Sequence, residues 1–166
     1  MSLIEFEFER PDNPVDTIEA VAALNDWTFE RSDEDEITVS VGGTWCDYHA
    51  SFSWMEEVEA LHVACAFDLK VSEQHRTEVV RLLALANEQL WMGHFDLWNQ
   101  EGVVMFRQSL LLAGGADATP GQIEGLLANA VDSCERYYQA FQFVLWAGKT
   151  ATEAVETALF ETMGEA

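Results

Sequence analysis

The sequence predicts one α+β domain in which a twisted antiparallel sheet carries helices mainly on one face. Two kinds of pattern lead to this class: alternating apolar and polar residues, typical of half-buried strands, and apolar residues at three- and four-residue spacing, typical of helices. Their order along the chain is α-β-β-β-β-α-β-β-α-α. A chain of 166 residues, 49% of them hydrophobic, can bury a core of its own. We expect this domain over residues 13–166, after an acidic N-terminal extension at residues 1–12.

The first helix and the first two strands have clear start signals. Asn13 can cap a helix whose first position is held by Pro14, a residue that suits this position because it lacks an N–H. Strands are expected at residues 27–32 and 36–41, and the acidic stretch between them predicts a solvated turn.

Two longer alternating runs follow, at residues 45–54 and 60–70, and predict an antiparallel hairpin in a meander. In the first run the even-numbered residues from Cys46 to Trp54 share the buried side. Strict alternation would then place Trp45 on the opposite side.

A helix and a second hairpin come next. The helix is expected to run from its cap, Ser72, to about Met92, and to end at Gly93. The hairpin strands are expected at residues 95–98 and 103–112.

Two further helices complete the predicted domain. Thr119 and Gln122 form a capping box that begins a long helix ending at Ala147, and Thr150 with Glu153 repeats this pattern for the last helix. The second half of the long helix is apolar nearly all round, so we expect it to be covered on more than one side by the last helix or by another subunit.

The charge of the chain limits its partners. It contains 30 acidic and 8 basic residues, a net charge of −22. Binding to nucleic acid or to an anionic membrane surface needs Lys and Arg, so neither is expected, although the acidity could serve solubility alone. Three cysteines without CxxC spacing, no signal peptide and no long apolar run indicate the cytoplasm.

No motif indicates catalysis or a bound cofactor. The four histidines are far apart, and no histidine or cysteine pair has zinc-ligand spacing, so we expect no metal. No nucleophile and base are paired in a known motif. Arg107 could anchor a partner's carboxylate, but an internal ion pair with Asp96 or Glu88 is the favoured interpretation because acids are abundant nearby.

The aromatic residues give the stronger interaction signal. Most of the six tryptophans are expected to fill the core, but tryptophan and tyrosine on an acidic surface are typical of a protein-binding patch. The candidate partner-binding residues are Trp45, Trp54, Trp91, Trp98 and Arg107.

Five stretches of the chain resemble the YbjN family of bacterial proteins, often described as sensory transduction regulators. They are NPVDTIEAV, WCDYHASFSW, ACAFDLKV, LLALANEQLWMGHFDLWNQEGVVMFRQSLLL and CERYYQAFQFVLWAGKTATEAV, which together span nearly everything from Asn13 to Val155. The resemblance implies a fold like that of type III secretion chaperones. It implies no catalytic residues, and because chaperone-like relatives pair, it also favours a homodimer.

We therefore expect a non-enzymatic cytoplasmic regulator or chaperone-like adaptor that binds another protein, by edge-strand pairing and aromatic pockets. Two alternatives stay open. One is a strict secretion chaperone with a dedicated secreted client, and the other is a small-molecule sensor that uses a cavity between sheet and helices.

Overall fold

The computed structural model describes residues 12–164, and the side chains of residues 12–159. Within that range the chain forms a six-stranded antiparallel sheet with four α-helices. The strands are β1 (Thr28–Asp33), β2 (Glu36–Gly42), β3 (Asp47–Met55), β4 (Ala60–Lys70), β5 (His94–Trp98) and β6 (Val103–Leu111). The helices are α1 (Pro14–Leu24), α2 (Arg76–Gln89), α3 (Pro120–Ala147) and α4 (Ala151–Gly164), with short 3-10 turns at Glu56–Val58 and Glu73–His75. The predicted α+β class and element order are confirmed.

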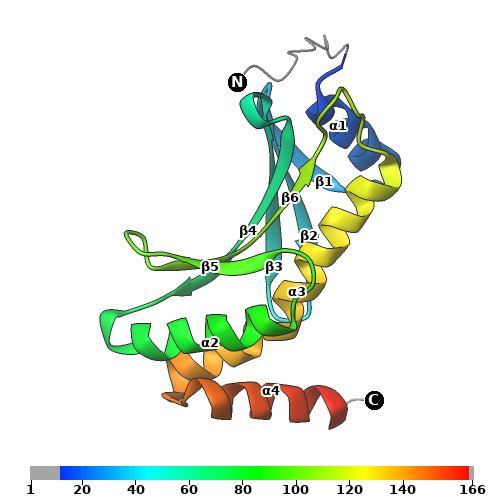
Figure 1. The fold of residues 1–166 in the computed structure, drawn as a ribbon. Coiled ribbons are helices and arrows are strands. Elements are labelled where there is room, and N and C mark those ends of the chain that lie inside the picture. The colour runs from blue at the N-terminus through cyan, green and yellow to red at the C-terminus, as the bar shows by residue number, and fades with distance from the viewer. Residues whose placement is uncertain (1–11, 165–166) are drawn as a thin grey trace, which may run out of the picture.

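The order of strands in the sheet is β1-β2-β3-β4-β6-β5. After β4 the chain therefore leaves the sheet, forms α2 and the outermost strand β5, and returns as β6 between β5 and β4. Figure 1 shows the resulting twisted sheet, with α1 and α3 on one face, α2 beside β5, and α4 packed outside α2 and α3. The acidic extension expected at the N-terminus lies outside the described residues, except for its last residue, Asp12.

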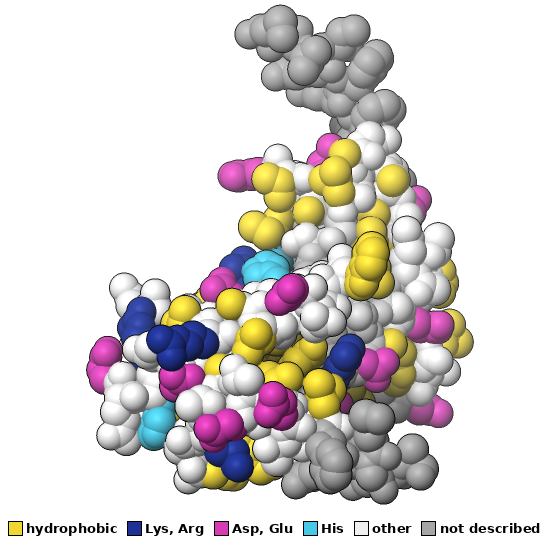
Figure 2. All heavy atoms as spheres, turned by 60° about the horizontal axis from the view of Figure 1, so that its bottom comes forward, with side chains coloured by type: hydrophobic (Ala, Val, Ile, Leu, Met, Phe, Trp, Pro, Cys, Tyr) yellow, Lys and Arg dark blue, Asp and Glu magenta, His cyan; other side chains and the backbone are white. Residues whose placement is uncertain are grey.

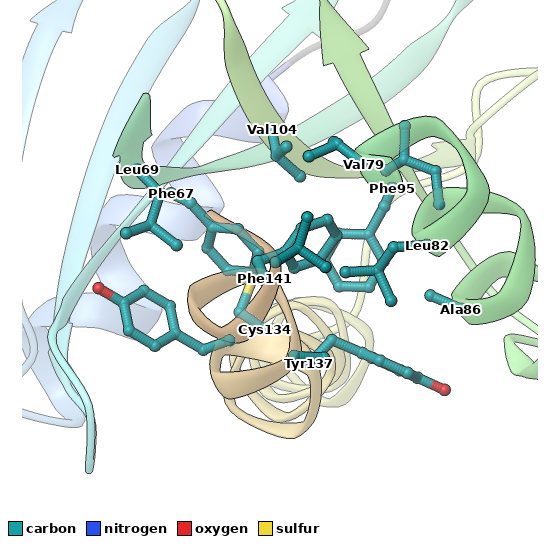
Figure 3. Close-up of a cluster of buried hydrophobic side chains, with 14 of the residues drawn as sticks. Phe67, Leu69, Val79, Leu82, Ala86, Phe95, Val104, Cys134, Tyr137 and Phe141 are labelled. Atoms are coloured by element: carbon teal, nitrogen blue, oxygen red, sulfur yellow. The ribbon is translucent and has the colours of Figure 1, made fainter. Parts of the chain in front are cut away.

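The core consists of two clusters on the helical face of the sheet. The first, under α1 and the beginning of α3, includes Ile18, Phe52 and Ile123. The second lies under α2 and the rest of α3, where Phe67 of β4 and Phe95 of β5 point toward Phe141 of α3 (Figure 3). Ring centroids in this trio are 5.3–5.7 Å apart, within the range of favourable aromatic contacts. Because α3 contributes to both clusters, it joins the two ends of the domain.

The predicted helix starts at α1, α3 and α4 are observed. The Asn13 side chain accepts a hydrogen bond from the Val15 N–H (3.0 Å). Thr119 and Gln122 exchange the two bonds of a capping box. The Glu153 N–H donates to the Thr150 hydroxyl at 3.3 Å. These side chains satisfy N–H groups that the first turn of a helix leaves unpaired.

Both predicted ends of the second helix were wrong. Helix α2 begins at Arg76 rather than after Ser72 and ends at Gln89 rather than near Met92. The Ser72 hydroxyl bonds to the His75 ring (2.9 Å) instead of capping a backbone N–H, and a 3-10 turn comes first. The segment after Gln89 turns toward β5.

Strand β3 begins at Asp47 rather than at Trp45, so alternation does not extend to Trp45. The preceding residues form a tight turn, in which the Gly43 N–H donates to the Cys46 carbonyl (2.9 Å) and the Thr44 N–H donates to Glu135 of α3 (2.9 Å). These local bonds compete with extension of the strand.

The second half of α3 is covered on several sides within one chain. The sheet, α2 and α4 all contact it, and α4 buries Ala151, Ala154 and Ala158 against its neighbours. Covering by the last helix was one of the two alternatives expected, and it needs no second subunit.

Candidate functional site: a free edge of β6

Strand β6 is longer than its outer neighbour β5. The two pair from Trp98 opposite Val103 to His94 opposite Arg107, and there the pairing stops. On the other side, β6 continues along β4 as far as Leu111, which lies opposite Ala60. Residues 108–111 therefore have a strand on one side and, within residues 12–164, none on the other. We call these residues the free edge of β6.

The backbone direction along the free edge follows from one bond. The Leu112 N–H donates to the Glu59 carbonyl (2.7 Å), on the β4 side. Backbone groups point alternately to the two sides of an antiparallel strand. The N–H and C=O groups of Ser109 and Leu111 therefore point away from β4, into the lane that β5 does not occupy.

The lane is open because the chain that comes from α2 joins the sheet only after Gly93. Gly93 has φ +75°, a backbone conformation that favours glycine. A side chain there would also place a Cβ 2.3 Å from Cζ of Phe106. Close contact with β6 at this point therefore requires glycine, and the connection from α2 reaches the sheet only at His94.

The outer edge of β5, by contrast, is closed by side chains. Asn87 of α2 accepts a hydrogen bond from the Phe95 N–H (2.7 Å) and donates one to the Phe95 carbonyl (3.0 Å), as a neighbouring strand would. The Leu97 N–H donates to the carboxylate of Asp96 (2.9 Å). Proteins commonly protect edge strands in such ways, so the contrast with β6 is informative.

A groove of about 580 Å³ lies along the free edge, and we call it the edge groove. Its walls include Met92, His94, Arg107 and Leu110. Met92 in its wall is 59% exposed, and Leu111, which follows the lining residue Leu110 in β6, is 67% exposed. On the face shown in Figure 2, hydrophobic side chains are interspersed with acidic ones rather than gathered in one wide patch. A partner on such a surface would rely on backbone pairing and a few anchors.

Arg107 is held in an internal network at the edge groove. Its guanidinium donates to His62 Nε2 (3.0 Å) and lies 3.3 Å from the Asp96 carboxylate. The predicted ion pair with Asp96 is confirmed, whereas Glu88, the other candidate acid, makes no ion pair with Arg107 in the described structure. Partial burial, and then the charges of Arg107 and His94, lower the pKa of His62. A neutral His62 is the form that can accept the bond from Arg107.

The four candidate tryptophans do not form one patch. Trp91 is fully exposed and precedes Met92, at the edge groove. Trp98 (45% exposed) is at the opposite end of β5, and Trp45 (38%) lies in the turn before β3. Trp54 is 9% exposed and belongs to the cluster under α1, so it is core in the free chain.

Sequence reasoning missed the bonds from Asn87 and the open lane itself. A signal for the lane was nevertheless present, because the second strand of the predicted hairpin was more than twice as long as the first. Unequal hairpin strands leave part of the longer one unpaired unless another element covers it.

Other chemistry finds little basis in the described residues. Between residues 12 and 164, no three His, Cys, Asp or Glu side chains are grouped so that they could hold a metal ion. None of the helices in this range combines the length and the apolar character that crossing a bilayer takes.

The fold and the open edge define an α+β protein with an accessible sheet edge, and sequence comparison places it in a family. The sequence model of YbjN, described as "Putative bacterial sensory transduction regulator", matches residues 14–143. The chain belongs to the YbjN family.

Solved structures with a similar fold include one described as "YbjN, a putative transcription regulator from E. coli". It is 10% identical in sequence, with a TM-score of 0.54 over 73% of this chain and 85% of that one. A second, the ExsC-ExsE complex, is 18% identical with a TM-score of 0.49, over 76% of this chain and 93% of that one. No curated protein matches the chain.

Proposed function

We propose that this YbjN-family protein is a non-enzymatic regulator that acts as a chaperone-like adaptor, by binding an extended segment of another protein along the free edge of β6. The observation that carries the proposal is the contrast between the outer edge of β5 and the free edge of β6. Side chains close the edge of β5, while Ser109 and Leu111 direct four backbone groups into the lane that β5 does not occupy. Strand addition at such an edge is a common way to bind an extended peptide.

The anchors of the segment would be the exposed apolar residues at the groove. Leu111, Met92 and Trp91 are at least 59% exposed and lie at or next to the lane. Hot spots in interfaces are commonly buried aromatic and apolar groups surrounded by weaker contacts. Trp98, at the end of β5, and Trp45, in the turn before β3, remain candidate binding residues for a longer partner that extends beyond the free edge.

The acidic character of the chain supports a protein partner over nucleic acid or an anionic membrane. We also propose that the protein works in the cytoplasm, where its three free cysteines would stay reduced. A homodimer remains part of the proposal, but the apolar surface of α3 no longer argues for it. Pairing of two copies through the free edge of β6 would occupy the same backbone groups as a partner segment.

The two alternative functions, a strict secretion chaperone and a small-molecule sensor, require different features of the structure. A strict secretion chaperone would use the same edge and differ only in having a secreted client. A small-molecule sensor needs a cavity between sheet and helices, where the described apolar side chains pack into the two core clusters. The edge groove therefore favours a segment of protein chain.

The test places the photo-reactive amino acid p-benzoylphenylalanine at Leu111, and separately at Leu24, which is 86% exposed at the end of α1. Irradiation in the native bacterium should give a cross-linked protein from position 111 and not from position 24. Hydrogen exchange of the purified complex should then show protection of the Ser109 and Leu111 amides, which face solvent in the free chain.

Two variants check the geometry with the purified partner. Ser109→Pro removes one outward N–H without breaking a bond to β4, and the Kd should rise about fivefold, equivalent to one hydrogen bond. Leu111→Lys should raise the Kd at least about thirtyfold, the lower limit for a hot spot. Leu24→Lys is the control and should change little. Cross-linking from position 24 alone, or binding that both β6 variants leave intact, would contradict the proposal.

A further inference from the structure

A second groove, distinct from the edge groove, lies where the start of β1 and the end of β2 meet the first half of α3. Its volume is about 410 Å³. The floor is apolar and is formed by Trp27, Val41, Leu127 and Val131. Trp27 is half-buried and packs against the cluster under α1, so its ring is held in place while one part faces the groove. We call this the Trp27 groove.

The rim of the Trp27 groove carries three exposed carboxylates. Asp26 lies beside Trp27, and Glu124 and Asp132 come from α3. No Lys, Arg or His side chain is among the residues that line the groove. Among residues 12–159, Asp26 and Asp132 form no ion pair, while Glu124 accepts a weak hydrogen bond from Asn25 (3.4 Å). An apolar floor with a negative rim is complementary to a side chain that is apolar along its stem and positive at its end.

We propose that the Trp27 groove binds an arginine side chain on a segment of a partner protein. The arginine stem would lie on Val131 and Val41, and the guanidinium would reach the Trp27 ring and the rim carboxylates. Arginine suits this site better than lysine, because its planar head is weakly hydrated, stacks on aromatic rings and pairs with carboxylates through two hydrogen bonds.

The charge of the whole chain also favours binding of a positively charged side chain. A net charge of −22 attracts a positive segment from a distance, and carboxylates at the groove then fix where it binds. An anionic or purely apolar side chain would gain nothing from this rim. The inference goes beyond the proposed function and stands without it, since the Trp27 groove is at the β1 side of the sheet and the free edge is next to β5.

The test uses a defined probe, the peptide acetyl-Ala-Leu-Arg-Leu-Ala-amide, and a twin in which neutral citrulline replaces arginine. Binding is followed by ¹⁵N–¹H NMR, and the indole signal of Trp27 is assigned from its loss in Trp27→Phe. The arginine peptide should move the indole signal of Trp27 and the amide signals of Leu127 and Val131. The citrulline peptide should bind about fivefold more weakly, which corresponds to the upper range of an exposed ion pair.

A matched pair of double variants separates the groove from the overall charge. Glu124→Gln with Asp132→Asn should raise the Kd on the order of tenfold, as two ion pairs are lost. Glu56→Gln with Glu57→Gln removes the same charge from the exposed turn before β4 and should change the Kd less than twofold. Equal effects of the two pairs, or shifts that leave Trp27 unmoved, would overturn the proposal. Leu111→Lys should not weaken binding of the arginine peptide, so this test is independent of whether the edge groove binds a partner.

Discussion

Replacing Asn87 by alanine should destabilise the domain more than its position near the end of a helix suggests. The side chain makes two hydrogen bonds, 2.7 and 3.0 Å, to the backbone of Phe95, whose own side chain is buried. Each bond contributes about 1 kcal/mol net, and leaving the N–H and C=O of Phe95 unpaired adds a desolvation cost. The expected loss in the free energy of unfolding is about 2–4 kcal/mol, or a fall in Tm on the order of 10 °C for a domain of this size.

Urea unfolding followed by circular dichroism measures this loss, with two comparison variants. Asn87→Asp keeps an acceptor for the Phe95 N–H but loses the donor to the carbonyl, so it should also destabilise. Gln89→Ala changes an exposed residue two positions further in the same helix and should stay within about 0.5 kcal/mol of the wild type. If Asn87→Ala behaves like Gln89→Ala, Asn87 does not close the edge of β5 and our explanation of the contrast with β6 fails.

Three further outcomes are expected. The buried Tyr48 hydroxyl has no hydrogen-bond partner within normal geometry, and burial, followed by the nearby Glu135 carboxylate, raises its pKa. Tyr48→Phe should therefore leave stability unchanged or raise it by up to about 1 kcal/mol. A clear loss of stability in urea unfolding would reveal a bond from the hydroxyl. NMR titration should give His62 a pKa below 6.5, and Arg107→Gln should raise it only partway, because burial is the larger cause. The stability that His62 contributes should thus be present above pH 6.5 and be lost as the pH falls toward its folded pKa; a pKa at or above 6.5 would contradict this. Trp54→Ala should lower the free energy of unfolding by about 3–5 kcal/mol, whereas Trp91→Ala should keep the wild-type Tm and lose partner binding. If both variants are unfolded, Trp91 is not a surface anchor.

The fold could be predicted because its signals are local. Thr119 and Gln122 form a capping box within four residues, and alternation in β3 and β4 follows directly from the two-residue period of a strand. The boundaries that were wrong depended on competing local bonds, such as that between Ser72 and His75, which periodicity does not report.

The candidate site was less predictable because it depends on which strands are neighbours in the sheet and which side chains meet there. The pairing of Arg107 with Asp96 was predictable from hairpin geometry, since both belong to neighbouring strands. The hydrogen bond that Arg107 donates to His62 joins residues 45 positions apart, and predicting it requires knowing that β6 rather than β5 lies next to β4. Alternation along the strand placed Trp54 on the buried side, as observed, whereas no local pattern around Trp91 indicated that its side chain is fully exposed.

The length of the connection between α2 and β5 determines how much of the edge of β6 is left unpaired. The outer lane beside β6 is filled by β5 up to His94 and vacant beyond it, and the four-residue connection after α2 sets that limit. In the antiparallel register that places His94 opposite Arg107, a relative with two more residues extended before β5 would reach Ser109, and one with four more would also reach Leu111 and present a finished edge. A relative with a shorter β5 would expose a longer stretch. Insertions or deletions in one connection could thus tune how much chain is bound, while the hydrophobic core that stabilises the domain stays as it is.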